Sequence, residues 1–346
     1  MDNRGSAQHI AQALLKMLEL YDIGASTENQ IEQVTRHVWK INTSKGTFGI
    51  KAVPFNSSRL EYLYQVNQHL IQMDFPGVAK MLATVQGLPY WEDDQGRCYY
   101  AYEWIEGQKY NLNSKKSQLR GMTKLAELHK AAVGFFPKGI EIPDRWGQWP
   151  EKFRDRAMEI NGWLQKEPPL EDEDEAWREV YEHGSYFAEQ ALMATEMISS
   201  PEYQQVTEQE QALGTFCHRD YAPRNLLVGA NQQLHILDFD YSICDIRLYD
   251  LTRFLQIVVS EQNWDWEVGR GLLTEYHRVR PLAPAEQCIL AANLWFPRKF
   301  WLYGKHLRHQ SEYTVRDGLA RNLRTALLEE GRRVAFINQL QKWKMA

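Results

Sequence analysis

The stretch that decides the fold is residues 216–228, FCHRDYAPRNLLV, together with the motif DFD at 238–240. Its skeleton is H-x-D-x-x-x-x-N, followed directly by an apolar strand. This spacing places the carboxylate of Asp220, the amide of Asn225 and the carboxylate of Asp238 on adjoining loop and strand ends. One carboxylate can face an acceptor hydroxyl, while the amide and the second carboxylate can hold a hard cation between phosphates. The pattern therefore predicts phosphoryl-transfer chemistry.

The composition is that of an ordinary globular chain. Of its 346 residues, 44% are hydrophobic and 25% charged, which rules out intrinsic disorder as the main state. There are 40 Lys and Arg against 45 Asp and Glu, a net charge of −5. Because nucleic-acid and acidic-membrane binders carry a strong basic excess, we expect neither kind of partner.

The cysteines and the N-terminal segment indicate the compartment. The four cysteines are too scattered for a disulfide framework or a metal site, so we expect reduced thiols in a cytosol-type compartment. Residues 1–24 have an amphipathic helical period but no continuous apolar signal core. No stretch approaches the roughly 18 apolar residues of a membrane span. We therefore expect neither export by an N-terminal signal nor a membrane span.

Secondary-structure patterns divide the chain at residue 106. Residues 1–106 read as an N-terminal helix, a five-stranded sheet and one long helix at 59–73. The predicted strands are 31–35, 38–42, 47–53, 78–85 and 97–105. Residues 107–346 read as mostly helical, with helices at 115–134, 150–165, 172–196 and over most of 247–342, and short strands at 225–229 and 234–239. The prediction is an α+β protein with a small antiparallel-sheet lobe and a larger helical lobe.

The motifs resemble those of the protein-kinase-like superfamily, in its aminoglycoside-phosphotransferase and choline-kinase branch. Protein kinases share H-R-D-x-x-x-x-N and D-F-G, and the DFD at 238–240 is nearer to the small-molecule branch. The following Asp250-Leu251-Thr252 resembles the Asp-Leu-Ala of that branch. The short segment between the two motifs leaves little room for a peptide-binding activation segment, which disfavours a protein substrate. The resemblance implies a two-lobed kinase-like fold.

Within that branch the chain resembles the CotS-type spore coat proteins of endospore-forming bacteria, from about residue 10 to 340. The resemblance is carried by Trp149-Pro150, Phe216-Cys217-His218, Arg280-Pro281-Leu282, Phe296-Pro297 and Phe300-Trp301. It implies a location in the mother-cell cytoplasm, with deposition in the spore coat, and other coat proteins as partners.

The resemblance also implies roles for single residues. Asp220 corresponds to the catalytic base, and Asn225 and Asp238 correspond to the metal ligands. Lys51, at the end of the strand Phe48–Lys51, corresponds to the lysine that binds the α- and β-phosphates of ATP. Glu61, in the first long helix, is the candidate for the ion-pair partner of this lysine.

Further positions complete the predicted nucleotide site. The carbonyl of Glu103 and the amide of Ile105 correspond to the backbone groups that read adenine. No G-x-G-x-x-G separates the first two strands, so Thr35 and the two residues after it are expected to cover the phosphates. Asp250 corresponds to the aspartate that braces the catalytic loop. Asp240 replaces the glycine of D-F-G, either binding the cation indirectly or capping a turn.

These assignments lead to two hypotheses. The first is an ATP- and Mg²⁺-dependent phosphotransferase that acts on a hydroxyl of a small molecule or a saccharide, with the acceptor site in the helical lobe. The second is a catalytically weak or inactive structural component of the spore coat that uses the kinase fold as a scaffold. The intact motif set favours the enzyme, whereas the missing glycine loop and Asp240 favour the scaffold.

Overall fold

The computed structural model describes residues 3–24, 30–165, 175–309 and 313–344. The chain forms two compact units. The first, which we call the N-terminal unit, comprises Met1–Asn111, Ala131–Pro143 and His218–Ile243. The second, the helical unit, comprises Leu112–Lys130, Asp144–Cys217 and Cys244–Ala346. The predicted boundary at residue 106 lies close to Asn111, and the motif segment His218–Ile243 belongs to the N-terminal unit.

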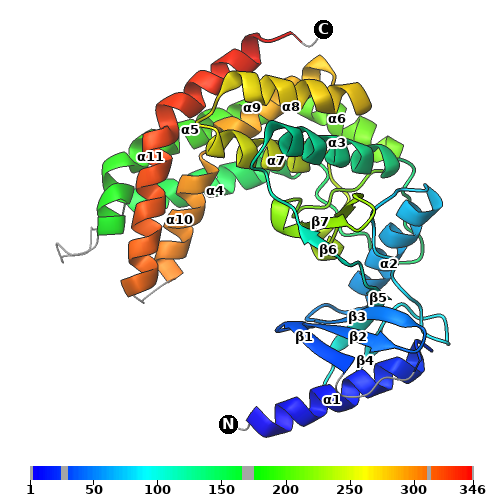
Figure 1. Ribbon diagram of the computed structural model, residues 1–346. Helices are drawn as coiled ribbons and strands as arrows, with labels where there is room; N and C mark the ends of the chain where they lie inside the picture. Colours follow the sequence, from blue (N-terminus) through cyan, green and yellow to red (C-terminus); the bar gives the residue numbers. More distant parts are fainter. Residues whose placement is uncertain (1–2, 25–29, 166–174, 310–312, 345–346) are drawn as a thin grey trace. The chain divides into compact units, whose positions relative to one another are not determined.

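The N-terminal unit contains a five-stranded antiparallel sheet (Figure 1). Its order is β1-β2-β3-β5-β4. The strands are β1 (Ile31–Thr35), β2 (Val38–Thr43), β3 (Gly46–Val53), β4 (Trp91–Glu92) and β5 (Cys98–Glu103). Helix α1 (Asn3–Leu20) packs on the sheet, where Leu14 and Met17 contribute to a buried cluster with Ile41 and Ile50. The predicted amphipathic period of this helix thus reflects its packing against the strands.

Helix α2 (Ser57–Gln72) follows β3 and begins two residues before the predicted start. The side chain of its N-cap residue Asn56 accepts a hydrogen bond from the backbone N–H of Arg59 at 3.0 Å, which satisfies one amide of the first turn. Leu60, Leu63 and Leu70 on this helix are buried. The helix therefore presents one apolar face to the N-terminal unit.

The predicted strand at 78–85 is not formed. Residues Val78 and Met81 make only isolated bridges, to Ile236 and Tyr102. The side-chain amide of Asn67 on α2 instead donates to the carbonyl of Ala79 at 2.7 Å and accepts from the N–H of Met81 at 2.8 Å. A side chain thus supplies hydrogen bonds that a neighbouring strand would otherwise supply.

A three-stranded antiparallel sheet carries the two motifs. It joins β6 (Gly107–Lys109), β7 (Leu226–Gly229) and β8 (Leu234–Ile236) in that order. The short 3₁₀ turn Pro223–Asn225 leads into β7, and a second one, Phe239–Tyr241, follows β8. The predicted strand 234–239 therefore ends at Ile236, so that Asp238 lies just beyond it.

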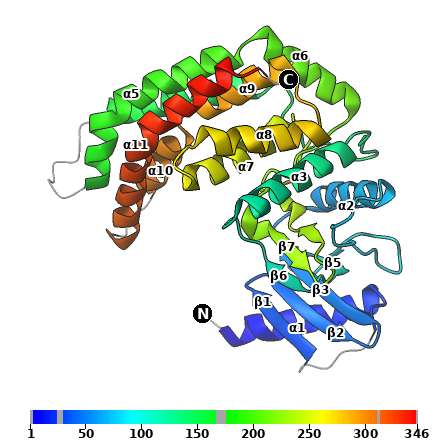
Figure 2. The ribbon, with the colours of Figure 1, turned by 45° about the horizontal axis from the view of Figure 1, so that its top comes forward.

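The helical unit is a stack of helices (Figure 2). They are α3 (Lys115–Ala131), α4 (Trp149–Leu164), α5 (Glu175–Ile198), α6 (Pro201–Leu213), α7 (Leu248–Glu261), α8 (Trp266–Val279), α9 (Pro284–Trp295), α10 (Arg298–His309) and α11 (Tyr313–Lys342). Helix α6 was not among the predicted elements, although Ser200 caps its start, Pro201 opens it and Gly214 ends it in the left-handed region.

The prediction of an α+β chain with an antiparallel sheet followed by mostly helical structure is confirmed. Across the described ranges, no helix combines the length and the apolar character needed to cross a membrane.

A buried charge network joins the helices of this unit. Arg247, 3% exposed, donates to Glu210 at 3.1 Å and to Glu286 at 2.9 Å. It also donates to the hydroxyl of Tyr276 at 3.2 Å, and that hydroxyl lies 2.7 Å from Nδ1 of the buried His129. Each buried charge in this network therefore has a partner of opposite charge or a hydrogen bond.

Candidate active site

His218 holds the loop that carries the first motif. The backbone N–H of Asp220 donates to its Nδ1 at 3.2 Å, so the proton of the neutral ring lies on Nε2. Nε2 then donates to the carbonyl of Leu237 at 2.9 Å. The imidazole is fully buried and lies 4.6 Å from the ring of Phe239. His218 therefore fixes the loop against the second motif.

The carboxylate of Asp220, the predicted base, is fixed by residues of its own loop. The Nδ2 of Asn225 donates to the backbone carbonyl of Asp220 at 2.8 Å and to Asp220 Oδ2 at 2.7 Å. Arg224 donates to the other carboxylate oxygen. The Asp220 side chain nevertheless remains 26% exposed, so an acceptor hydroxyl can reach it.

The two predicted metal ligands are neighbours in space. The N–H of Leu237 donates to the carbonyl of Asn225 at 2.8 Å, which sets Asp238 beside the end of the loop that carries the first motif. Asp238 has a φ of 61°, a left-handed conformation that aspartate tolerates better than most residues. Because the amide nitrogen of Asn225 is engaged by Asp220, the amide oxygen is the atom that could coordinate a cation. An amide oxygen and a carboxylate are hard donors, so this set fits Mg²⁺.

Lys51 is bonded to two carboxylates. Its Nζ lies 2.8 Å from Asp238 Oδ1 and 2.8 Å from Asp240 Oδ2. Within the described residues, Glu61 forms no ion pair with Lys51, so the predicted pair is replaced by one with the third residue of DFD. The reason lies in the tertiary fold, which brings the DFD turn after β8 to Lys51 on β3.

Burial shifts the pKa values of this cluster. Burial of Lys51 disfavours its charged form, but the nearby carboxylates of Asp240 and Asp238 outweigh this effect and raise its pKa. Burial raises the pKa of Asp240, although the charge of Lys51 opposes the rise. Burial also raises the pKa of Tyr100, whose hydroxyl donates to Asp240 at 2.9 Å.

One cavity of about 380 Å³ lies within the N-terminal unit. It is lined by five of the predicted site residues, Thr35, Lys51, Ile105, Asn225 and Asp238. Apolar side chains such as Val38, Met81 and Leu226 form much of the remaining wall. Glu103 lies directly before the lining residue Trp104 in the chain, and the side chain of Glu103 is exposed. The structure thus gathers most of the predicted nucleotide-site residues around one apolar-walled space.

Sequence reasoning missed the aromatic wall of this cavity. Tyr100 and Tyr102 lie on β5, and Trp104 comes directly after the strand. All three line the cavity. Tyr102 lies over Gly49, where an added Cβ would come within 2.3 Å of the tyrosine ring. The alternation of aromatic residues at 100, 102 and 104 was a signal that they share one face of the strand.

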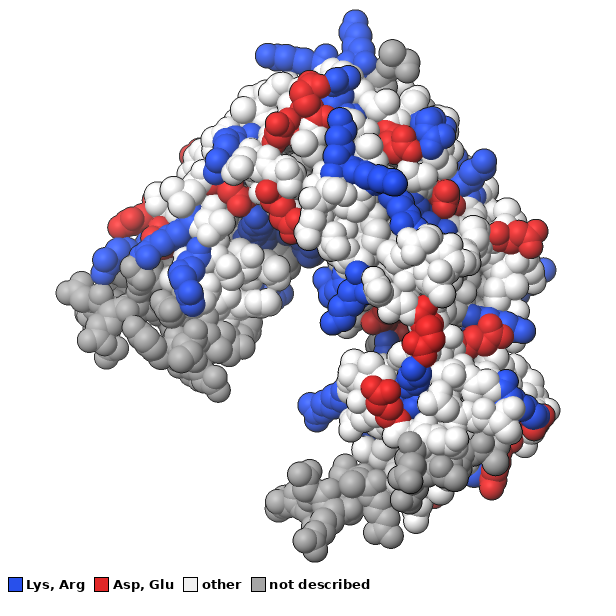
Figure 3. Space-filling view, viewed as in Figure 1, with Lys and Arg blue, Asp and Glu red and all other residues white. Residues whose placement is uncertain are grey.

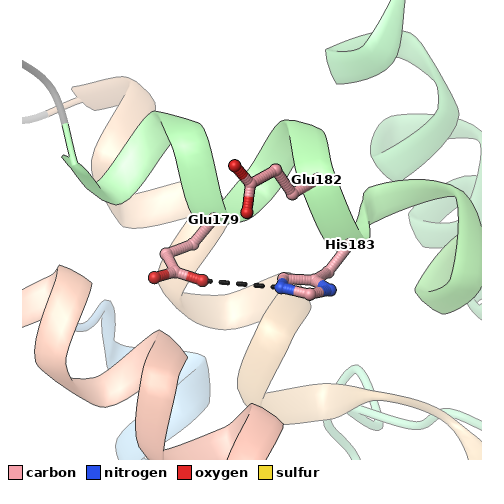
Figure 4. A group of neighbouring side chains, drawn as sticks. All are labelled: Glu179, Glu182 and His183. Carbon is pink, nitrogen blue, oxygen red and sulfur yellow. Dashed lines mark ion pairs between the residues drawn. The ribbon is translucent and has the colours of Figure 1, made fainter. Parts of the chain in front are cut away.

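A second group of possible metal ligands lies on α5 of the helical unit (Figure 4). The side chains of Glu179, Glu182 and His183 approach one another there. Glu179 is already engaged, since it accepts from Arg324 at 2.8 Å and pairs with His183 at 3.6 Å. Ion pairs near the surface therefore explain why these side chains lie together, and we assign no metal-binding role to them.

Charges of both signs are interspersed over the face shown in Figure 3. This pattern accords with the small net charge of −5. It differs from the broad basic surface by which proteins commonly bind nucleic acids.

Solved structures that share this fold include phosphotransferases and a kinase named for small molecules. An aminoglycoside phosphotransferase from Alicyclobacillus acidocaldarius matches with a TM-score of 0.76 at 20% identity, covering 93% of this chain and 94% of that one. AMP-bound spectinomycin phosphotransferase matches with a TM-score of 0.62 at 14% identity, covering 91% and 98%. Amicoumacin kinase in complex with AMP-PNP and Ca²⁺ matches with a TM-score of 0.58 at 15% identity, covering 96% of each chain. At these identities the likeness establishes the fold, which is that of the aminoglycoside phosphotransferases.

A family match covers most of the sequence. Residues 16–340 match the family described as "Spore coat putative kinase YutH". The match agrees with the resemblance to spore coat proteins of the kinase-like superfamily, and it gives the branch as YutH. The chain therefore belongs to the YutH family of spore coat kinase-like proteins.

Proposed function

We propose that this protein is an ATP- and Mg²⁺-dependent phosphotransferase that acts on a hydroxyl of a small molecule or a saccharide. The observation that carries the proposal is the cavity of about 380 Å³, which joins an apolar wall to Lys51, Asn225 and Asp238. An apolar wall suits a purine base, and the polar end suits phosphates with their cation.

The positions of the residues support the proposed nucleotide-binding roles. The backbone of Glu103 and Ile105 would bind adenine, and Thr35 would cover the phosphates from the end of β1. Lys51 would bind the α- and β-phosphates. Asn225 and Asp238 would hold Mg²⁺, which supplies positive charge that offsets the charge of the phosphates.

Asp220 would orient the acceptor hydroxyl and take its proton. The hydrogen bonds from Asn225 and Arg224 restrict the carboxylate to one orientation, which favours a productive approach. Arg224, 66% exposed, also places a positive charge where the transferred phosphoryl group would pass.

The acceptor class rests on the fold and on the chain length between motifs. Asp238 is followed by α7 already at Leu248, so no long segment that could bind a peptide intervenes. Two of the structural relatives are named for the small molecules spectinomycin and amicoumacin. A hydroxyl of a small molecule or a saccharide is therefore favoured over a protein side chain.

The family match supports a place in the spore. The protein would be made in the mother-cell cytoplasm and deposited in the coat, where other coat proteins would be its partners. A scaffold without catalysis is the second candidate function. The observation that favours it is that Lys51, the residue expected to bind phosphates, already has two carboxylate partners.

Thermal unfolding separates the two functions. A ligand that binds only the native state raises the unfolding temperature, so Mg·ATP should stabilise the parent protein by a few degrees. Asp238→Asn, which removes a charge from the metal site, should lose most of this rise. Asp94→Asn, a change of the same kind at an exposed loop position, should keep it. A parent protein that Mg·ATP does not stabilise would favour the scaffold.

A further inference from the structure

The partner of Lys51 is the feature that most departs from the kinase pattern. In protein kinases the corresponding lysine pairs with a glutamate of the helix that follows the strand. Here the two carboxylates within 2.8 Å of Lys51 Nζ both come from the DFD turn. Of these two, Asp238 is 36% exposed and Asp240 only 8% exposed. The two carboxylates are therefore suited to different tasks.

Asp240 is itself held from three sides. The Tyr100 hydroxyl donates to its Oδ1 at 2.9 Å, which leaves Oδ2 for Lys51. The guanidinium of Arg59 on α2 donates to its backbone carbonyl at 2.7 Å. Tyr100 is also the residue directly opposite Lys51 in the pairing of β3 with β5. Asp240 thus connects the DFD turn to two strands of the sheet through its carboxylate and to helix α2 through its backbone carbonyl.

We propose that Asp240 is the residue that positions Lys51, in place of an acidic residue of α2. It acts through Lys51 and keeps the ammonium group in the cavity when Asp238 is engaged by a metal ion. The physical reason is that a cation bound at Asp238 repels the ammonium group, which then needs a second anionic partner. The metal-dependent part of this inference rests on the proposed function, whereas the pairing of Lys51 with Asp240 does not.

The pairing is tested by a double-mutant cycle in thermal unfolding without nucleotide. Asp240→Asn should lower the unfolding temperature of the parent, because it removes a buried partner of Lys51. In a Lys51→Met background the same change should raise it, because two adjacent carboxylates then lack their cation. Tyr100→Phe, which keeps the ring, should give a smaller loss than Asp240→Asn in the parent.

The control for this cycle is Asp94→Asn, which should have the same small effect in both backgrounds. If Asp240→Asn shifts the unfolding temperature equally in the parent and in Lys51→Met, the two residues are not coupled and the inference is overturned. The difference between the shifts in the two backgrounds is therefore the decisive measurement.

The metal-dependent part is tested by titrating Mg²⁺ at a fixed ATP concentration and following the unfolding temperature. In Asp240→Asn, Lys51 and Mg²⁺ share Asp238, so the Mg²⁺ concentration for half-maximal stabilisation should rise about tenfold, as for the loss of one charge-assisted hydrogen bond. In the Lys51→Met background, Asp240→Asn should not raise it. A tenfold rise in both backgrounds would make Asp240 a direct contributor to the metal site and overturn its role through Lys51. A parent that does not respond to Mg·ATP would overturn the proposed function, and the cycle without nucleotide would still decide the pairing.

Discussion

Asp220 depends on its neighbours in the loop for its orientation. Asn225 and Arg224 each donate to one of its carboxylate oxygens, and His218 accepts the hydrogen bond of its backbone N–H. Arg219, directly before it, has a φ of 69°, which is uncommon for a residue other than glycine. Backbone strain of this kind persists where the surroundings fix the conformation, as they do here.

Asp220→Asn is the test of catalysis at this residue. The variant keeps the shape of the side chain but cannot take the proton of an acceptor hydroxyl. Because a positioned base contributes about 10²–10⁴-fold, we expect turnover to fall by at least that range. Nucleotide affinity should change little, since Lys51, Asn225 and Asp238 remain.

The measurement is phosphate transfer to a panel of sugars and amino alcohols, or slow ATP hydrolysis without an acceptor. Asp94→Asn is the matched control and should keep the parent rate. Unchanged turnover in Asp220→Asn would rule out this residue as the base.

The proposed adenine site lies at the end of β5 and in the segment that follows it. The N–H of Glu103 donates to Lys80 at 2.9 Å and the N–H of Trp104 donates to Thr47 at 3.1 Å, so the end of β5 is fixed on both sides. Ile105 follows outside the strands and lines the cavity. Recognition by the backbone of this segment predicts that side-chain identity matters little here.

Substitutions at Ile105 separate backbone from side-chain recognition. Ile105→Pro removes the amide proton and should weaken nucleotide binding about tenfold or more, as for a lost hydrogen bond to a buried group. Ile105→Ala keeps the proton and should have a much smaller effect, as should Glu103→Ala. Isothermal titration with Mg·ADP measures all three. Equal losses in Ile105→Pro and Glu103→Ala would contradict the backbone assignment.

Helix α1 shows how an element is tied to the sheet by more than its apolar face. His9 lies 2.9 Å from a carboxylate oxygen of Asp93, which is 6% exposed and follows β4. The burial of Asp93 opposes its ionisation, but hydrogen bonds from His9 and from backbone amides outweigh this effect and lower its pKa. The amphipathic period predicted the helix, whereas the polar contact depends on a residue 84 positions away.

At the scale of the whole molecule, the buried His129 and the half-buried His69 predict that stability depends on pH. Burial lowers the pKa of His129, although Asp250 at 3.4 Å opposes the shift, and burial also lowers the pKa of His69. Arg247 and Glu210 also act on His129, with opposite signs. A histidine with a lowered pKa binds fewer protons in the folded than in the unfolded state. Stability should therefore fall as the pH drops below about 6.5, the ordinary pKa of histidine.

This prediction is checked by the unfolding temperature at pH 7.5 and at pH 5.5. The parent should lose stability between the two, and His129→Gln should lose less, because one of the buried histidines no longer titrates. His37→Gln, at an exposed position of the N-terminal unit, should behave as the parent does. A parent whose unfolding temperature is unchanged or higher at pH 5.5 would contradict the prediction.

The sequence alone determined the features that rest on local patterns. The spacing H-x-D-x-x-x-x-N and the following DFD predicted the chemistry, because the two short strands between Asn225 and Asp238 bring these residues to adjoining ends. Alternating and helical periods predicted four of the five strands of the larger sheet, the first long helix and most of the helices that follow, since these periods reflect which face of an element is buried. Helix α6 could have been found in the same way, from Ser200-Pro201 at its start and Gly214 at its end.

Only the tertiary structure decided which side chains meet across long stretches of chain. Lys51 and Asp238 are 187 residues apart, and Asp240 rather than Glu61 completes the cluster because the DFD turn packs beside β3. The segment 78–85 has the composition of a strand and bonds to β5 through the backbone of Lys80 and Leu82, whereas the side chain of Asn67 bonds to Ala79 and Met81. A partner is chosen by burial and by which groups still need a hydrogen bond, and both depend on the packed structure rather than on local sequence.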